Sequence, residues 1–276
     1  MAKEFTKEDV IQQKKISIRA LNNLLEKYIN DSSEKHLKKA YLISYWLSDF
    51  TRLIDFEEKF IPTKNIAYKR GNIIKLNFGF NIGSEYGGLH YGIVLDNKNE
   101  HNSPVVTVIP LTSIKDSKPI HHNSVELGNE VYRLLKIKFD TLLKAAKEDL
   151  EQVAEMQATL KAIISSAQSA LTIRSAGEFI EKSDIQKDID KADDLQRILQ
   201  ERLDCNNNEI NYLEKIGKEI AGMKEGSIAL VNQITTVSKM RIYDPKNSKG
   251  VLASVSLSQE SMEKINQKIK DLFVFS

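Results

Sequence analysis

The spacing of apolar residues changes three times along this chain of 276 residues, and each change limits the folds that it can adopt. Helical spacing dominates residues 1–62, and alternation of apolar and polar residues follows as far as Gly128. Helical spacing returns over residues 129–224, and alternation resumes after Gly226. Because a change of period marks a change of secondary structure, the sequence predicts a β-rich unit interrupted by a long helical segment.

The first 62 residues are interpreted as an N-terminal helical extension. Thr6 is a candidate N-cap with Asp9 three positions further on. The helical pattern breaks in the stretch NDSSEKH, residues 30–36, and a second pattern follows it. Pro62 ends the second helix, because proline disfavours a helical conformation in the residue before it.

Short strands are expected over residues 63–128. The run NIIKLNFGFNIGS alternates, with Ile74, Leu76, Phe78 and Phe80 on one side. YGIVLD and VVTVIPLTS are β-branched runs separated by a turn-rich loop, and NSVELG supplies a short fourth strand. Strands without intervening helices indicate a small antiparallel barrel or sandwich.

Residues 129–224 have amphipathic helical spacing that predicts a coiled-coil-like helical hairpin or a small bundle. We expect its turn near Ser175–Ser183, and the run Asn206–Asn208 is a second candidate break. Because an insertion into a surface loop costs little closure entropy, residues 63–128 and 225–276 are interpreted as one discontinuous domain that carries this module.

Two strand-like runs and a helix follow Gly226. SIALVNQITTVSKMRI and VLASVSL are the expected strands, and SQESMEKINQKIKDLF is a terminal helix that begins after a serine N-cap. The predicted fold class is therefore α+β, with N-terminal helices, an inserted hairpin and an antiparallel β domain.

The charges balance closely, with Lys+Arg 40 against Asp+Glu 38 and a net charge of +2, which neither demands nor excludes a nucleic-acid partner. The single cysteine, Cys205, cannot form an internal disulfide or a thiolate metal site, and it favours a reducing compartment. The N-terminus lacks the apolar core of a signal peptide, and no window approaches the roughly 18 apolar residues of a membrane span. A soluble, cytoplasmic protein without a membrane partner is expected.

Three segments resemble the N-terminal half of the MazF/PemK family of toxins: RGNIIKLNFG, GSEYGGLHYGIVLDN and NSPVVTVIPLTS. SVEL and SIALVNQITTVSKMRI are similar to later segments of the same family, and all five occur in the family order. The resemblance implies an SH3-like barrel that forms a homodimer, and a metal-independent endoribonuclease for single-stranded RNA. It also implies a cognate antitoxin that blocks the RNA groove, and no cofactor or metal.

The sequence departs from the family pattern at several positions. His90 stands in place of the arginine of the GG.RP motif, and Tyr91 follows it in place of proline. Thr235 replaces the arginine of the QIRT motif, and Asn72 replaces an aspartate. Thr112 is retained at the position of the catalytic hydroxyl residue of the family.

RNA carries its own nucleophile, the 2′-OH, beside each phosphate, so a cleavage site needs a base, an acid and donors to the charged phosphorane. Histidine, with an ordinary pKa of about 6.5, can give or take a proton near neutrality, whereas arginine stays charged. We therefore expect His90 to act in general acid–base catalysis and Thr112 to hydrogen-bond the phosphate.

Further candidates for binding RNA lie in the glycine-rich turn and among the nearby cations. Glycines let backbone N–H groups approach a phosphate, and a carboxylate in this turn can act as a base or accept from a base edge. The expected RNA- and phosphate-binding residues are Arg70, Gly83, Ser84, Glu85, Gly87, Gly88, His122, Lys239 and Arg241.

Each of these residues also has a structural interpretation, as a packed histidine, a strand threonine or a solvated cation. The alternative to an endoribonuclease is a non-catalytic module that has lost both family arginines and binds a protein or DNA. The helical parts either cover the RNA groove as a built-in inhibitor or enlarge the dimer interface.

Overall fold

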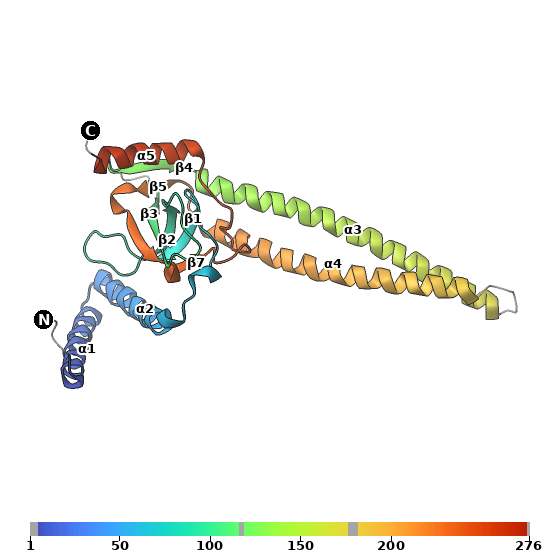
Figure 1. Cartoon of the computed structure of the whole chain (residues 1–276), viewed down its shortest axis with the longest axis horizontal. Helices are drawn as coiled ribbons and strands as arrows, with labels where there is room; N and C mark the ends of the chain where they lie inside the picture. Colours follow the sequence, from blue (N-terminus) through green and yellow to red (C-terminus); the bar gives the residue numbers. More distant parts are fainter. Residues whose placement is uncertain (1–4, 116–118, 176–181, 275–276) are drawn as a thin grey trace.

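The computed structural model describes residues 5–115, 119–175 and 182–274, which form a mixed α+β structure (Figure 1). The described residues contain five α-helices and seven strands. The helices are α1 (Lys7–Ile29), α2 (Glu34–Phe56), α3 (Glu130–Ser175), α4 (Lys182–Gly222) and α5 (Gln259–Phe273). The strands are β1 (Ile73–Asn77), β2 (Leu89–Val94), β3 (Val105–Ser113), β4 (Ser124–Gly128), β5 (Ser227–Leu230), β6 (Thr235–Ser238) and β7 (Ile242–Asp244).

The strands form one antiparallel sheet in the order β4-β5-β3-β2-β1-β7, and β6 also pairs with β3. The long strand β3 therefore has three partners, β2, β5 and β6. The two end strands, β4 and β7, are not paired with each other in the described part of the chain. The α+β class and the antiparallel sheet are confirmed, but hydrogen bonds do not close this sheet into the expected barrel.

Alternating residues of the sheet bury two separate apolar clusters. Ile73, Ile93 and Ile109 face a cluster that includes residues of α3, α4 and α5. Their neighbours Ile74 and Val94 face the other cluster. That second cluster also contains Leu76 and Phe78, so the side predicted for Ile74, Leu76 and Phe78 is confirmed.

The two N-terminal helices are confirmed, and residues 30–33 separate them. Thr6 and Asp9 form a capping box at the start of α1. No residue of α1 is buried, whereas α2 buries Ala40 and Ile43. In Figure 1, α2 lies below the sheet and α5 lies above it, while α1 extends away from α2.

The insertion is an antiparallel pair of long helices, α3 and α4, that projects far from the sheet (Figure 1). The first turns of α3 and the last turns of α4 contribute Val131, Leu135 and Ile216 to the core of the β domain. Near the start of α3, the Lys138 ammonium ties the hairpin to the β domain by donating to the carbonyl oxygens of Val251, at 2.8 Å, and of Ala253, at 2.7 Å.

The expected breaks within the insertion have different outcomes. Residues 176–181, where we expected the turn, lie outside the described residues. The break expected at Asn206–Asn208 is wrong, because α4 runs through all three residues. The Asn208 side chain donates to the carbonyl of Asp204 at 2.9 Å, a local bond that the helix accommodates.

The C-terminal segment differs from the prediction in one element. VLASVSL is not a strand but a series of turns that contributes an isolated bridge between Asn72 and Ser256. The Asp244 carboxylate holds these turns by accepting from the backbone N–H groups of Val251, at 3.0 Å, and Leu252, at 2.6 Å. The terminal helix α5 is confirmed, and none of the described helices is long and apolar enough to cross a membrane.

Candidate functional site

His90 and Thr112 lie on the same face of the sheet, on neighbouring strands. In the pairing of β2 with β3, Gly92 lies opposite Pro110 and Val94 opposite Val108. Continuing this register by two residues sets His90 across from Thr112. Because side chains alternate along a strand, both face the same side as Val94 and Val108, which belong to one apolar cluster. The predicted convergence of these two residues is thus present in the fold.

Tyr86, from the glycine-rich turn, links the two residues. Its ring packs against the imidazole of His90, with centroids 4.7 Å apart. Its hydroxyl donates to the carbonyl oxygen of Leu111 at 2.6 Å and is also hydrogen-bonded to the side chain of Thr112. Since the phenolic proton goes to Leu111, the Thr112 hydroxyl is the donor to Tyr86. A titratable ring, a phenol and an alcohol therefore form one continuous group.

Partial burial shifts the pKa values of this group. Burial lowers the pKa of His90 below its ordinary value of 6.5, so the imidazole is neutral at neutral pH and can accept a proton. Burial also raises the pKa of Tyr86, against the opposing effect of its hydrogen bond with Thr112, so the phenol keeps its proton. The resting site therefore holds one proton acceptor and two hydroxyl groups.

The glycine-rich turn is folded tightly against the end of β1. The Gly88 N–H donates to the carbonyl of Gly79 at 2.7 Å, and a Cβ added to Gly87 would lie 2.7 Å from that same oxygen. Gly88 has a φ of +90°, and a Cβ added there would lie 3.5 Å from Nε2 of His90. Gly87 therefore has no room for a side chain, and the positive φ of Gly88 favours glycine at that position.

The other predicted residues of the turn are more exposed. Glu85 accepts from the backbone N–H of Ile82 at 3.1 Å, which closes the turn locally. Ser84 and Gly83 are exposed, and a Cβ added to Gly83 would meet no atom within 4 Å. The three residues form the outer rim of the site and are available to a ligand.

Arg241 is the predicted cation that lies nearest to this group. Leu76 of β1 pairs with His90 on one side and with Ile242 on the other, so Arg241 and His90 flank the end of β1. The guanidinium donates to the carbonyl of Phe78 at 3.3 Å, and the Phe78 ring packs on Tyr86 at 5.6 Å. Burial lowers the pKa of Arg241 below its ordinary value, but an arginine side chain stays protonated in proteins.

No carboxylate forms an ion pair with Arg241 within the described ranges. A half-buried cation without an anionic partner has lost hydration without gaining an ion pair. Arg241 is therefore suited to receive a phosphate group at this end of the sheet.

Two of the predicted phosphate-binding cations are engaged elsewhere. Lys239 is fully buried, and its ammonium donates to the carbonyl of Glu100 at 3.0 Å, beneath the ring of Tyr68. Arg70 donates to the carbonyl of Leu95, at the other end of β2 from His90, and to the side chain of Asn266. Both predictions are corrected, because these cations are tied to the fold and do not join His90.

His122 is exposed, and its ring packs against that of His121 with centroids 4.3 Å apart. No contact between this pair and His90, Tyr86 or Thr112 appears in the part of the chain that the structure describes. Within the same part, no group of three or more His, Cys, Asp or Glu side chains is arranged to hold a metal ion.

Sequence reasoning missed two residues that build the site. Tyr86 is the one aromatic residue of the GSEYGG turn, and its position between glycines was the available signal. Gln233 lies in the QIT segment, where it accepts from the N–H of Tyr86 at 3.2 Å and donates to the carbonyl of Ser84 at 3.5 Å. Gln233 thus holds the turn from a short 3₁₀ helix, Val231–Gln233, more than a hundred residues away in sequence.

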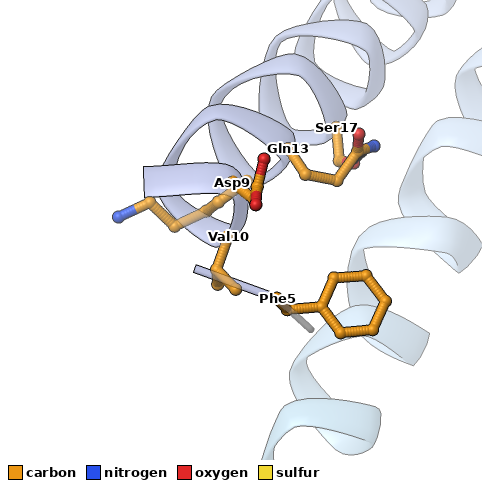
Figure 2. A pocket seen from close by; sticks show the side chains of 6 residues that line it. Phe5, Asp9, Val10, Gln13 and Ser17 are labelled. Atoms are coloured by element: carbon orange, nitrogen blue, oxygen red, sulfur yellow. Dashed lines mark hydrogen bonds between the residues drawn. The ribbon is translucent and has the colours of Figure 1, made fainter. Parts of the chain in front are cut away.

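A surface pocket of about 510 Å³ lies on α1 and not at this group (Figure 2). Figure 2 shows Phe5 and Val10 side by side at its mouth, with Asp9 and Gln13 above them. Asp9 is occupied in capping α1, and no histidine lines the pocket. It therefore offers no group for proton transfer.

Comparison with known proteins finds one family model that matches part of the chain. Residues 69–169 match the model of a family described as "PemK-like, MazF-like toxin of type II toxin-antitoxin system". The match contains β1 to β4, His90, Tyr86 and Thr112, and it ends within α3. A search of the curated proteins found no match to this chain.

Proposed function

We propose, from the premise that residues 69–169 belong to the PemK-like, MazF-like toxins of type II toxin–antitoxin systems, that this chain is an endoribonuclease toxin. Its substrate would be single-stranded RNA, such as mRNA in the cytoplasm, and its reaction would need no metal. The observation that carries the proposal is the contact of His90 with Tyr86, whose hydroxyl is hydrogen-bonded to Thr112. This contact brings a neutral base and an alcohol to one face of the sheet.

In the proposed reaction, Nε2 or Nδ1 of His90 takes the proton of the 2′-OH, and the 2′-oxygen attacks the adjacent phosphorus. A bond forms between that oxygen and phosphorus, and the bond from phosphorus to the 5′-oxygen breaks. The imidazolium of His90 then returns the proton to the departing 5′-oxygen. The products are a 2′,3′-cyclic phosphate and a 5′-hydroxyl, and no oxidant or reductant is consumed.

Two further groups would stabilise the charged phosphorane. Rotation about the Cβ–Oγ bond of Thr112 redirects its hydroxyl proton from Tyr86 to a phosphoryl oxygen. Arg241 supplies the permanent positive charge that His90 does not have in its neutral form. Donors aimed at developing charge are commonly the largest contribution to catalysis, so the site does not depend on the two family arginines that are replaced by His90 and Thr235.

The family also supports proposals about partners. A cognate antitoxin would bind the toxin and block the RNA groove, and the active form would be a homodimer. Coexpression with the protein encoded beside this chain, followed by copurification and loss of cleavage, tests the first of these proposals.

Cleavage of a labelled single-stranded RNA in the presence of excess EDTA tests the main proposal. We expect the wild type to cut the RNA and His90→Ala to lose at least a hundredfold in rate, because general acid–base catalysis typically contributes about 10²–10⁴-fold. Equal rates for both proteins, or no cleavage by either, would contradict it. RNA binding by a wild type that does not cut RNA would instead favour the non-catalytic module.

A further inference from the structure

The helix α2 meets the sheet beside the candidate site. Gly79, at the end of β1, has a φ of +94°, and a Cβ added there would lie 3.0 Å from Cζ2 of Trp46. The Trp46 ring thus lies directly on the backbone whose carbonyl accepts from the N–H of Gly88, and a Cβ added to Gly88 would contact His90. Because a side chain at position 79 would meet this ring, the end of the sheet is shaped to receive α2.

The same tryptophan contacts the unpaired cation of the site. The guanidinium of Arg241 lies over the Trp46 ring, 5.1 Å from its centroid. One turn further along α2, Oδ2 of Asp49 accepts from the side-chain amide of Asn77 and from the hydroxyl of Tyr243, each at 3.0 Å. α2 therefore contacts the strands on both sides of Arg241.

The contact between α2 and Arg241 distinguishes two possible roles of the helix, which are to block the RNA site or to form part of it. A segment that competed with RNA for Arg241 would be expected to present a carboxylate to it. The nearest acidic residue of α2, Asp49, bonds to Asn77 and Tyr243 instead, and Arg241 meets an aromatic ring. A ring stacked on a guanidinium fixes its orientation and leaves its charge available.

The aromatic residues around Arg241 match a site for single-stranded nucleic acid. Such sites combine a cation for the backbone with aromatic rings on which bases stack. Tyr243 is 43% exposed, Trp46 is partly exposed, and the Asp49 carboxylate between them can accept from the edge of a base.

We propose that α2 forms the outer wall of an RNA-binding site, in which Trp46 orients Arg241 toward the phosphate backbone. Together with Tyr243, Trp46 presents an aromatic platform to a nucleotide that flanks the scissile phosphate. This inference rests on the proposed function for its substrate, single-stranded RNA. It concerns residues outside the segment that matches the toxin family.

The chain contains a single tryptophan, so emission excited at the red edge of the protein absorption, where tyrosine does not absorb, reports on Trp46 alone. The full-length protein is titrated with a single-stranded RNA whose 2′-hydroxyls are methylated, so that no cleavage occurs during the measurement. We expect the emission of Trp46 to be quenched, with a midpoint equal to the Kd obtained from the anisotropy of the same oligonucleotide carrying a fluorescent label.

Matched variants locate the effect. Trp46→Ala should weaken binding about tenfold, as expected for loss of a stacking contact and of the orientation of Arg241, and Trp46→Phe should weaken it less. Tyr45→Ala is the control, because Tyr45 is 62% exposed and packs on Tyr41 of the same helix. Circular dichroism before titration identifies any variant that fails to fold. If Trp46→Ala does not fold, the binding of RNA by Trp46→Phe and the quenching in the wild type test the proposal instead.

The outcomes separate this inference from the proposed function. RNA binding without a change in Trp46 emission, or equal or tighter binding by Trp46→Ala, would overturn the inference and leave cleavage untouched. If RNA quenches the Trp46 emission but unmethylated RNA is not cleaved, the result would support the role of α2 in RNA binding and contradict the proposed endoribonuclease activity. Absence of RNA binding would overturn both.

Discussion

In the proposed reaction His90 determines the chemistry, because it stands where the family pattern has an arginine. An arginine there would bind phosphate but could not transfer a proton near neutrality. His90 contacts the ring of Tyr86 and is partly buried, and burial keeps its imidazole neutral at the pH of the cell. The replacement therefore exchanges a fixed charge for a base.

The pH dependence of cleavage follows from this assignment. Burial lowers the pKa of His90 below 6.5, so the protonated and inactive form accumulates only below that value. We expect kcat/KM to rise with pH through an apparent pKa below 6.5 and to level off at neutrality. A rate that falls between pH 6 and pH 7, or the same acidic limb in His90→Gln, would exclude His90 as the base.

Tyr86 should contribute through its hydroxyl separately from its ring. Tyr86→Phe keeps the contact with His90 but removes the bonds to Leu111 and Thr112. Loss of one such hydrogen bond is worth roughly 1 kcal/mol, so we expect kcat to fall about fivefold to tenfold with little change in KM. Tyr86→Ala, which also removes the ring, should lose more, and an unchanged kcat in Tyr86→Phe would mean that the hydroxyl has no part in the reaction.

At the residue scale, local pattern predicted some of the site and tertiary contacts decided the rest. The placement of His90 and Thr112 on one face of the sheet was predictable, because side chains alternate along strands that pair with each other. The burial of Lys239 could not be predicted, because its ammonium donates to the carbonyl of Glu100, which is far away in sequence. The role of Gln233 depends on the same kind of distant contact.

Among the helices and strands, the spacing of apolar residues distinguished helix from strand in every long segment. It failed for VLASVSL, where alternation accompanies turns that are held by the Asp244 carboxylate. It also failed to distinguish a break from a continuous helix at Asn206–Asn208. Polar residues inside a helical seam interrupt the pattern without interrupting the backbone.

Asn206 is the weak point of the hairpin formed by α3 and α4. It is 2% exposed, and among the described residues neither its amide nitrogen nor its carbonyl oxygen has a hydrogen-bond partner. A buried group without a partner costs about 1–3 kcal/mol. We therefore expect Asn206→Leu to raise the free energy of unfolding by about 1 kcal/mol and the Tm by about 2–4 °C.

The neighbouring position provides the control for this prediction. Asn207 is exposed on the same helix, so Asn207→Leu should leave the thermal unfolding of the chain almost unchanged. A drop in Tm for Asn206→Leu would show that the buried amide is needed, for example to fix the register of the two helices.

At the scale of the whole molecule, the hairpin has two parts with different roles. Its base belongs to the core of the β domain, through Val131, Leu135 and Ile216. Further from the sheet the two helices are joined to each other, for example by the ion pair between Arg202 of α4 and Asp149 of α3 at 3.0 Å. The helical module predicted over residues 129–224 therefore includes residues that belong to the core of the β domain.

Shortening the hairpin tests this division. Residues 157–194 are replaced by a short glycine-rich loop between Met156 and Leu195, which line one pocket between the helices. We expect RNA cleavage and the Tm of the β domain to be retained, whereas deletion of residues 131–222 should prevent folding because it removes part of the core. Loss of cleavage in a folded shortened protein would assign a direct role to the outer hairpin.

The central claim is that the 2′-hydroxyl of RNA is the nucleophile and that His90 activates it. The most direct measurement is the chemistry of the ends produced by wild-type protein in EDTA, analysed by mass spectrometry, with a 2′-O-methylated RNA of the same sequence as control. We predict a 2′,3′-cyclic phosphate and a 5′-hydroxyl from the unmodified RNA and no cleavage of the methylated one. Products with a 5′-phosphate, or cleavage of the methylated RNA, would contradict the mechanism.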